Sequence, residues 1–99
     1  MNTITVDRLA HLDDAVVIDV READEYATGH VPGAVSLPLS TLQENLQSVP
    51  RDTPVHVIRQ AGGRSAKAPQ LVTGLGIDAT NVTGGTQAWI DEQLPLERP

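Results

Sequence analysis

The chain has no cysteine among its 99 residues. Without a thiol it can form neither a disulfide nor a thiolate metal site, and it carries no cysteine nucleophile. It also lacks phenylalanine and has one tryptophan and one tyrosine. We therefore expect a single small domain, residues 1–99, whose core is built from valine, leucine, isoleucine and alanine.

Basic residues are scarce as well, with 7 lysines and arginines against 13 acidic residues and a net charge of −6. This balance argues against nucleic acid or an anionic membrane as the main partner. No apolar run is long enough to span a bilayer and no stretch resembles a signal peptide, so we expect a cytoplasmic location. The histidines show no ligand spacing, so we expect neither a metal nor a cofactor. They stand at His11, His30 and His56.

Short apolar runs alternate with segments of helical pattern. Strands are expected at residues 4–6, 15–20, 35–38, 55–58 and 79–83, and helices at 7–12, 22–28, 40–48, 65–73 and from 86 onward. The runs are short and rich in β-branched residues, as buried parallel strands are. This order predicts an α/β fold with a central parallel sheet of about five strands and helices on both faces.

Local signals give the expected ends of these elements. Side-chain caps are expected at Asp7, at Ser40 or Thr41, and at Thr86. Leu39, Leu42 and Leu46 share one face at helical spacing, which predicts one continuous helix there. Gly84-Gly85 should form a tight turn, and Trp89 should pack in the core. The tail, residues 94–99, should be extended.

The stretch from Val55 to Lys67 has a pattern that can bind an anion. It reads as an apolar strand, a turn containing Gly62 and Gly63, and the start of a helix. Ligands of parallel α/β proteins bind at the carboxyl ends of strands, and a helix amino end offers unpaired backbone N–H groups. The residues from Arg59 to Ser65 are therefore a candidate anion cradle. The alternative is an ordinary loop between a strand and a helix.

Polar residues follow the strand at 15–20 and the helix at 22–28. Asp19 and Arg21 are either ligand-binding residues or an ion pair that braces the loops at the end of the sheet. We favour structural bracing, because a nearly buried charge needs a partner to offset its desolvation. His30 is either a general base or, as is more common in such a turn, a residue that ties its loop to a backbone carbonyl.

Two stretches resemble the rhodanese domain family. The first runs from Asp19 to Ala34 and continues to Leu37-Pro38, and it is similar to the amino-terminal signature of the family almost position for position. The second runs from Arg59 to Lys67 and is followed by Gly84-Gly85-Thr86-Gln87-Ala88-Trp89. Together they cover essentially the whole chain, whose length suits the single-domain type.

The resemblance implies a sulfurtransferase. In that family, a cysteine thiolate at the start of the loop takes a sulfane sulfur from a donor such as thiosulfate. The resulting persulfide passes the sulfur to cyanide or to a cellular thiol. The family's cysteine position falls on Arg59 in this chain. The six-residue loop from Arg59 to Arg64 resembles the sulfur-transferring members and not their longer-looped phosphatase relatives.

Arg59 cannot replace a thiolate, because a guanidinium stays protonated and has no sulfur chemistry. The chain is thus either a catalytically silent rhodanese module, or an active sulfurtransferase whose cysteine is replaced only in this version. A silent module would bind an anion or a partner protein, or regulate an active paralogue. Phosphatase chemistry would need the same cysteine and a longer loop. A flavodoxin-like or receiver-type binding domain would leave the first signature unexplained.

The resemblance also implies which residues hold a ligand. The loop amides would hold a small sulfur-containing anion or another oxyanion, and Arg64 would add a bidentate contact. These amides belong to Gln60, Ala61, Gly62, Gly63, Arg64 and Ser65. Arg59 should either point to solvent or share the bound anion with the amides, because the cradle is already positive. A protein sulfur acceptor or partner would present basic groups to this acidic chain.

Overall fold

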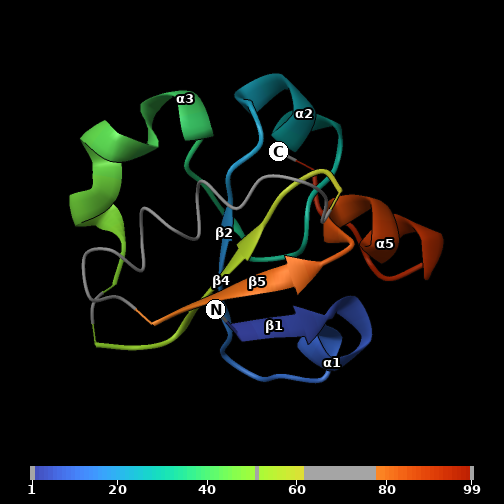
Figure 1. The fold of residues 1–99 in the computed structure, drawn as a ribbon. Coiled ribbons are helices and arrows are strands. Elements are labelled where there is room, and N and C mark those ends of the chain that lie inside the picture. The colour runs from blue at the N-terminus through green and yellow to red at the C-terminus, as the bar shows by residue number, and fades with distance from the viewer. Residues whose placement is uncertain (1, 51, 62–77, 99) are drawn as a thin grey trace.

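The computed structural model describes residues 2–50, 52–61 and 78–98, and it contains a five-stranded sheet in the order β1-β5-β4-β2-β3. All neighbouring strands run parallel (Figure 1). The strands are β1 (Asn2–Thr5), β2 (Val16–Asp19), β3 (Val35–Ser36), β4 (Val55–Ile58) and β5 (Ala79–Thr83). The predicted α/β architecture is confirmed.

Helical segments cover both faces of the sheet. They are α1 (Val6–Ala10), α2 (Ala23–Thr28), α3 (Leu39–Leu42), the 3-10 segment η1 (Gln43–Ser48) and α5 (Gly85–Asp91). In Figure 1, α3 lies on one side of the sheet, and α1 and α5 lie on the other. The helix expected at residues 65–73 lies outside the described residues.

Alternating side chains of the central strands fill two separate core clusters. Val57 belongs to the cluster that contains Leu42 of α3, and Ile58 belongs to the cluster that contains Trp89 of α5. Successive residues of a strand point to opposite faces, so a strand covered on both faces must be apolar throughout. This is why β4 is apolar at three of its four positions, with His56 as the exception. Trp89 is buried, as expected.

The predicted cap of α1 is wrong by two residues. The helix begins at Val6, directly after β1, and the hydroxyl of Thr5 accepts a hydrogen bond of 3.3 Å from the backbone N–H of Arg8. Asp7 therefore lies in the first turn, where its negative charge still favours the helix dipole. The helix ends at Ala10 instead of Leu12.

The segment expected to be one helix at 40–48 is two elements. α3 follows Pro38, which is its N-cap, and a 3-10 geometry takes over at Gln43. Neither expected cap has that role: the Ser40 hydroxyl donates to the Glu22 carboxylate, and the Thr41 hydroxyl donates to the Pro38 carbonyl. No side chain caps this helix; its first N–H, on Leu39, donates to the carbonyl of Val20 at 3.0 Å instead.

The last helix begins earlier than predicted. α5 starts at Gly85 with Gly84 as its N-cap, so Thr86 lies inside the helix, where it is buried, and does not cap it. The tail after α5 returns to the first half of the chain, where Glu97 forms an antiparallel bridge with His30. Within the described ranges, no helix has the length and apolarity to cross a membrane.

Candidate functional site

The loop after β4 is fixed to the first turn of α5 by backbone hydrogen bonds. The N–H of Thr86 donates to the carbonyl of Arg59 at 2.7 Å, and the N–H of Gln87 donates to the carbonyl of Gln60 at 2.8 Å. The amides of a first helical turn have no partner within their own helix. Here they hold the beginning of the loop in place at the carboxyl edge of the sheet.

Gly84 and Gly85 make this close approach possible. Both have positive φ, +81° and +61°. A Cβ atom on Gly85 would collide with the carbonyl oxygen of Arg59 and would lie 2.9 Å from the carbonyl carbon of Gln60. A side chain at residue 85 would therefore push the helix away from the loop. This is the physical reason for glycine at residue 85, whereas a Cβ atom at residue 84 would meet the side chain of Ala88 in α5.

Asp19 and Arg21 form a buried ion pair at the carboxyl end of β2. Nη2 of Arg21 lies 2.9 Å from Oδ2 of Asp19, and the Arg21 Nε lies 3.1 Å from Oδ1. The backbone N–H of Arg21 also donates to Oδ1 at 3.0 Å. Both carboxylate oxygens are thus engaged by one neighbour. Their assignment to structural bracing instead of ligand binding stays a prediction.

The ion pair continues into a chain of polar contacts that reaches the loop. Arg21 donates to the carbonyl of Gly29 at 2.8 Å and to the side-chain oxygen of Gln60 at 3.3 Å. The Gln60 amide nitrogen donates to Gln87 at 3.4 Å, and Gln87 donates to Asp91 at 2.9 Å. The end of β2, the loop and α5 are connected in this way.

Gln87 was not identified from the sequence as a site residue. It lies 27 residues from Gln60 along the chain, and no local spacing connects the two.

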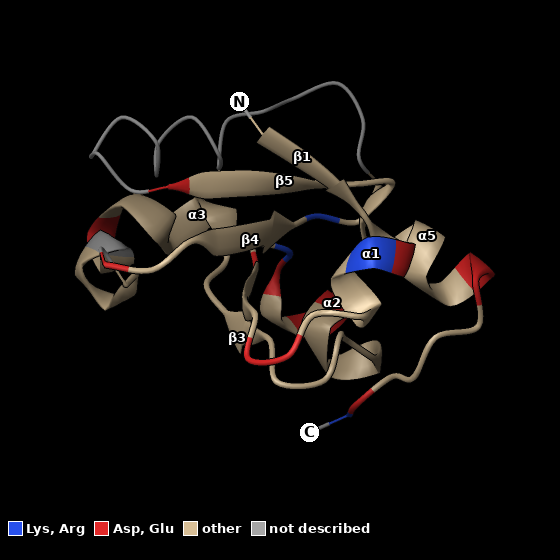
Figure 2. Cartoon of the chain, turned by 90° about the horizontal axis from the view of Figure 1, so that it is seen from below, with Lys and Arg blue, Asp and Glu red and all other residues tan. Residues whose placement is uncertain are grey.

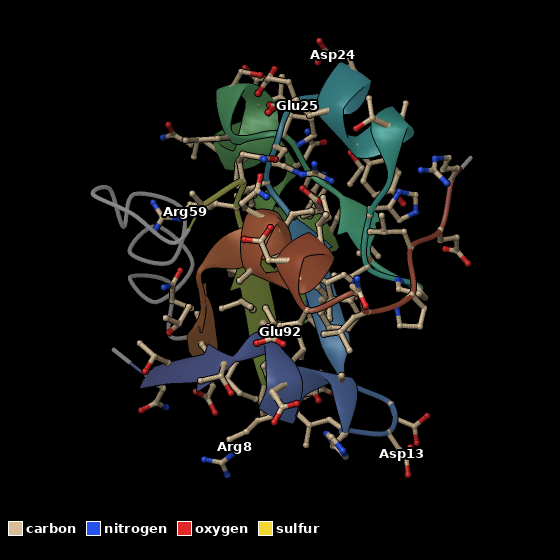
Figure 3. The ribbon with its side chains drawn as sticks, turned by 90° about the vertical axis from the view of Figure 1, so that its right-hand side faces the viewer. Arg8, Asp13, Asp24, Glu25, Arg59 and Glu92 are labelled. Atoms are coloured by element: carbon tan, nitrogen blue, oxygen red, sulfur yellow. The ribbon has the colours of Figure 1, made fainter. Side chains whose placement is uncertain are left out.

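Arg59 follows β4 directly and is half-buried. Figure 3 shows its side chain directed away from α2 and α5. Gln60 and Ala61 are exposed. The remaining residues of the predicted anion cradle, Gly62, Gly63, Arg64 and Ser65, lie outside the described residues. The cradle, and the position of Arg59 toward an anion, therefore stay predictions.

His30 is buried and faces the tail. Its ring stacks on Tyr26, with centroids 3.6 Å apart and planes 5° from parallel. Nδ1 lies 2.9 Å from the carbonyl oxygen of Tyr26, and Nε2 lies 3.5 Å from the Glu97 carboxylate. The contact with a backbone carbonyl is the one expected for a residue that ties down its loop. The sequence offered no local signal for Glu97, which is far from His30 along the chain.

The Tyr26 phenol is partly buried and lies near two carboxylates. Burial raises the pKa of its phenol above the ordinary value of 10.0, and the charges of Asp19 and Glu97 raise it further. In the described part of the chain, no three acidic or histidine side chains come together as metal ligands would.

Comparison with known proteins gives a consistent picture. A family model described as the rhodanese-like domain matches residues 5–92. A protein named sulfurtransferase from Allochromatium vinosum is 31% identical over 93 residues, which cover 93% of this chain and 87% of the relative.

Solved structures show the same fold. The crystal structure of a rhodanese-related protein from Thermoplasma volcanium has a TM-score of 0.91 and 32% identity, with 100% of both chains covered. A rhodanese-like domain protein from Staphylococcus aureus has a TM-score of 0.87 and 36% identity, covering 100% of this chain and 99% of that one. Both structures exceed 30% identity over almost their whole length, so the likeness extends beyond the fold.

Proposed function

Because this chain belongs to the rhodanese-like domain family, we propose that it is a rhodanese module that does not itself transfer sulfur. One observation carries the proposal: the chain has no cysteine. The resemblance to the family implies that its nucleophilic cysteine position falls on Arg59. A guanidinium remains protonated at any ordinary pH and cannot form a persulfide. The covalent intermediate on which sulfur transfer depends is therefore not accessible to this chain.

The module retains the means to bind an anion. The proposed receptor is the amide-lined loop of residues 60–65, with a small sulfur-containing anion or another oxyanion as ligand. Support comes from the fixed start of this loop, where the Arg59 and Gln60 carbonyls accept from α5 and the Gln60 side chain accepts from Arg21. A loop that is held before the ligand arrives loses less conformational freedom on binding.

One observation favours a second candidate, an active rhodanese whose cysteine is replaced only in this version of the chain. Gly85 still admits the carbonyl of Arg59, and the polar contacts from Asp19 to Gln60 are intact. The backbone at position 59 is thus held by contacts that do not involve the side chain of this residue.

An assay of sulfur transfer from thiosulfate to cyanide distinguishes the two candidate functions. Thiocyanate formation is measured for this chain, for Arg59→Cys, and for Arg59→Ser as the control that removes the guanidinium without adding a thiol. In Arg59→Cys, the thiolate attacks the sulfane sulfur of thiosulfate, the S–S bond breaks, and sulfite leaves with the electron pair. Cyanide then takes the outer sulfur of the persulfide, which gives thiocyanate and restores the thiolate.

We expect no turnover from the present chain or from Arg59→Ser. Turnover by Arg59→Cys alone would favour the second candidate and show that only the nucleophile is missing. Silence of all three would favour the module. Turnover by the unaltered chain would overturn the proposal.

Anion binding is tested separately by titrating this chain with thiosulfate, sulfate and phosphate and following its amide resonances. We expect saturable shifts at the loop that weaken in Arg59→Ser, because one cation is lost. A loop that shows no shift at millimolar anion would disprove the receptor.

A further inference from the structure

A groove lies outside the loop that follows β4. It has a volume of about 290 Å³ and is framed by α1, the start of β2, the turn at residues 31–32, α5 and the tail. Nine of its ten lining residues are apolar, among them Leu9, Leu12, Pro32 and Trp89. The volume is at the small end of the range for ligand pockets. It suits one or two side chains better than a whole small molecule.

The groove is already formed in the isolated chain. The Trp89 indole N–H donates to the carbonyl of Pro95 at 2.6 Å, which fixes the ring and the tail on the same side of the groove. Trp89 is 4% exposed, whereas Leu12 at the margin is 45% exposed. An incoming apolar group would cover Leu12 without first ordering the walls, so little conformational entropy would be lost.

The margin of the groove is acidic. The segments 6–15 and 85–92, which contribute α1 and α5, contain five acidic residues and one basic residue. The acidic residues are Asp7, Asp13, Asp14, Asp91 and Glu92. Asp14 itself lines the groove. Figure 2 shows acidic positions along the connection after α1 and at the end of α5.

Arg8, the basic residue of these two segments, is not oriented to neutralise their carboxylates. In Figure 3, Glu92 lies between α5 and α1 and Asp13 lies on the connection after α1, whereas Arg8 points away from both. Among the described residues, none of these carboxylates forms an ion pair. An apolar groove with such a border favours a ligand that is apolar in its centre and positive at its ends.

We propose that this groove docks a basic segment of a partner protein, with one or two aliphatic side chains inside it and lysine or arginine beside Asp13, Asp14 and Glu92. A second copy of this chain fits poorly, because each copy carries a net charge of −6. The proposal does not depend on the chemistry at Arg59, since none of residues 59–61, the described part of that loop, lines the groove.

The single tryptophan of the chain makes the groove directly observable, because Trp89 lies in its wall. The probe is an acetylated hexapeptide with two leucines flanked on each side by two lysines. We expect a saturable change of Trp89 fluorescence with a Kd on the order of 100 µM, as for a weak, small interface. Binding should weaken as salt is raised.

Two altered peptides and two double variants serve as controls. One peptide carries glutamates in place of the lysines, and the other carries alanines in place of the leucines. Asp13→Asn with Asp14→Asn removes two charges at the margin and keeps a residue type that tolerates the positive φ of residue 14. Glu44→Gln with Asp52→Asn removes two exposed charges outside the groove-lining segments.

The first double variant should bind the basic peptide about three- to tenfold more weakly, and the second should leave binding nearly unchanged. Equal weakening in both variants would mean that only net charge matters, and it would overturn the groove as the site. Equal binding of the acidic peptide, or no saturable change at about 1 mM peptide, would also overturn the proposal. Self-association of the chain that quenches Trp89 would assign the groove to a second copy instead.

Discussion

Asp19 is fully buried, and Arg21 is the residue that makes this burial tolerable. A buried carboxylate loses its hydration, and this cost is offset only if its oxygens find partners. Arg21 supplies bonds to both oxygens and uses its remaining N–H groups on Gly29 and Gln60. One arginine thus connects β2, the end of α2 and the loop after β4.

The substitution Arg21→Met should lower the free energy of unfolding by about 3 kcal/mol, because the Asp19 carboxylate would then be buried without its cation. The measurement is urea unfolding at neutral pH. The control is a double-mutant cycle with Asp19→Asn, in which the double variant should lose less than the sum of the single losses. Strictly additive losses would show that the two side chains do not stabilise each other.

Side-chain contacts between residues that are close in the sequence were predictable, and contacts between distant residues were not. Asp19 and Arg21 are two residues apart at the end of an apolar run, so an ion pair between them was predictable. The contact of Gln60 with Gln87 joins different elements, and nothing in either local sequence indicates it.

Among the elements, strands were more predictable than helix ends. Buried parallel strands have a strong signal, and the run from Ala79 to Thr83 coincides with β5. The expected helix at 40–48 failed because the backbone changes from α to 3-10 geometry at Gln43, inside the segment that the leucine spacing predicts to be continuous. Leu42 is fully buried while Leu39 is 38% exposed, so the apolar face expected from the sequence does not pack as one surface.

The junction of α5 with the loop after β4 depends on Gly85, and we expect Gly85→Ala to lower the free energy of unfolding by about 3 kcal/mol. Two costs add: an alanine at φ +61°, and the collision of its Cβ with the carbonyl oxygen of Arg59. Urea unfolding measures the loss. It should be accompanied by shifted amide resonances of Thr86 and Gln87, whose N–H groups bond the loop.

Gly33→Ala is the matched control for that substitution. Gly33 has a φ of +81°, yet a Cβ atom there would meet nothing within 4 Å. Its loss should therefore be only the backbone cost, about 1 kcal/mol. Equal losses in the two variants would show that the close approach of loop and helix contributes nothing to stability.

At the scale of the whole molecule, the tail after α5 returns to the first third of the chain and bonds to it. The backbones of His30 and Glu97 exchange two hydrogen bonds of 2.9 Å, and Arg98 donates to the carbonyl of Thr28 at 3.0 Å. These pairs are about seventy residues apart along the chain. Such pairing depends on the completed sheet and helices, which is why the sequence predicted an extended tail but not its partner.

Tyr26 lies where these distant parts meet, and it should make the stability of the protein depend on alkaline pH. Its hydroxyl donates to the carbonyl of Ala34 at 2.7 Å, and burial, then Asp19, then Glu97 raise its pKa above 10.0. The folded state therefore holds this proton more tightly than the unfolded state. The resulting stabilisation is complete below pH 10 and is lost as the pH rises through the pKa of the folded state.

The chain has a single tyrosine, so ultraviolet absorbance of the phenolate follows Tyr26 alone. The folded protein should titrate at higher pH than the protein in concentrated urea. Tyr26→Phe should flatten the loss of unfolding free energy above pH 10, because the phenol that titrates there is removed. Coincident titration curves for the folded and unfolded protein would contradict the prediction, because the fold would then place no penalty on the phenolate.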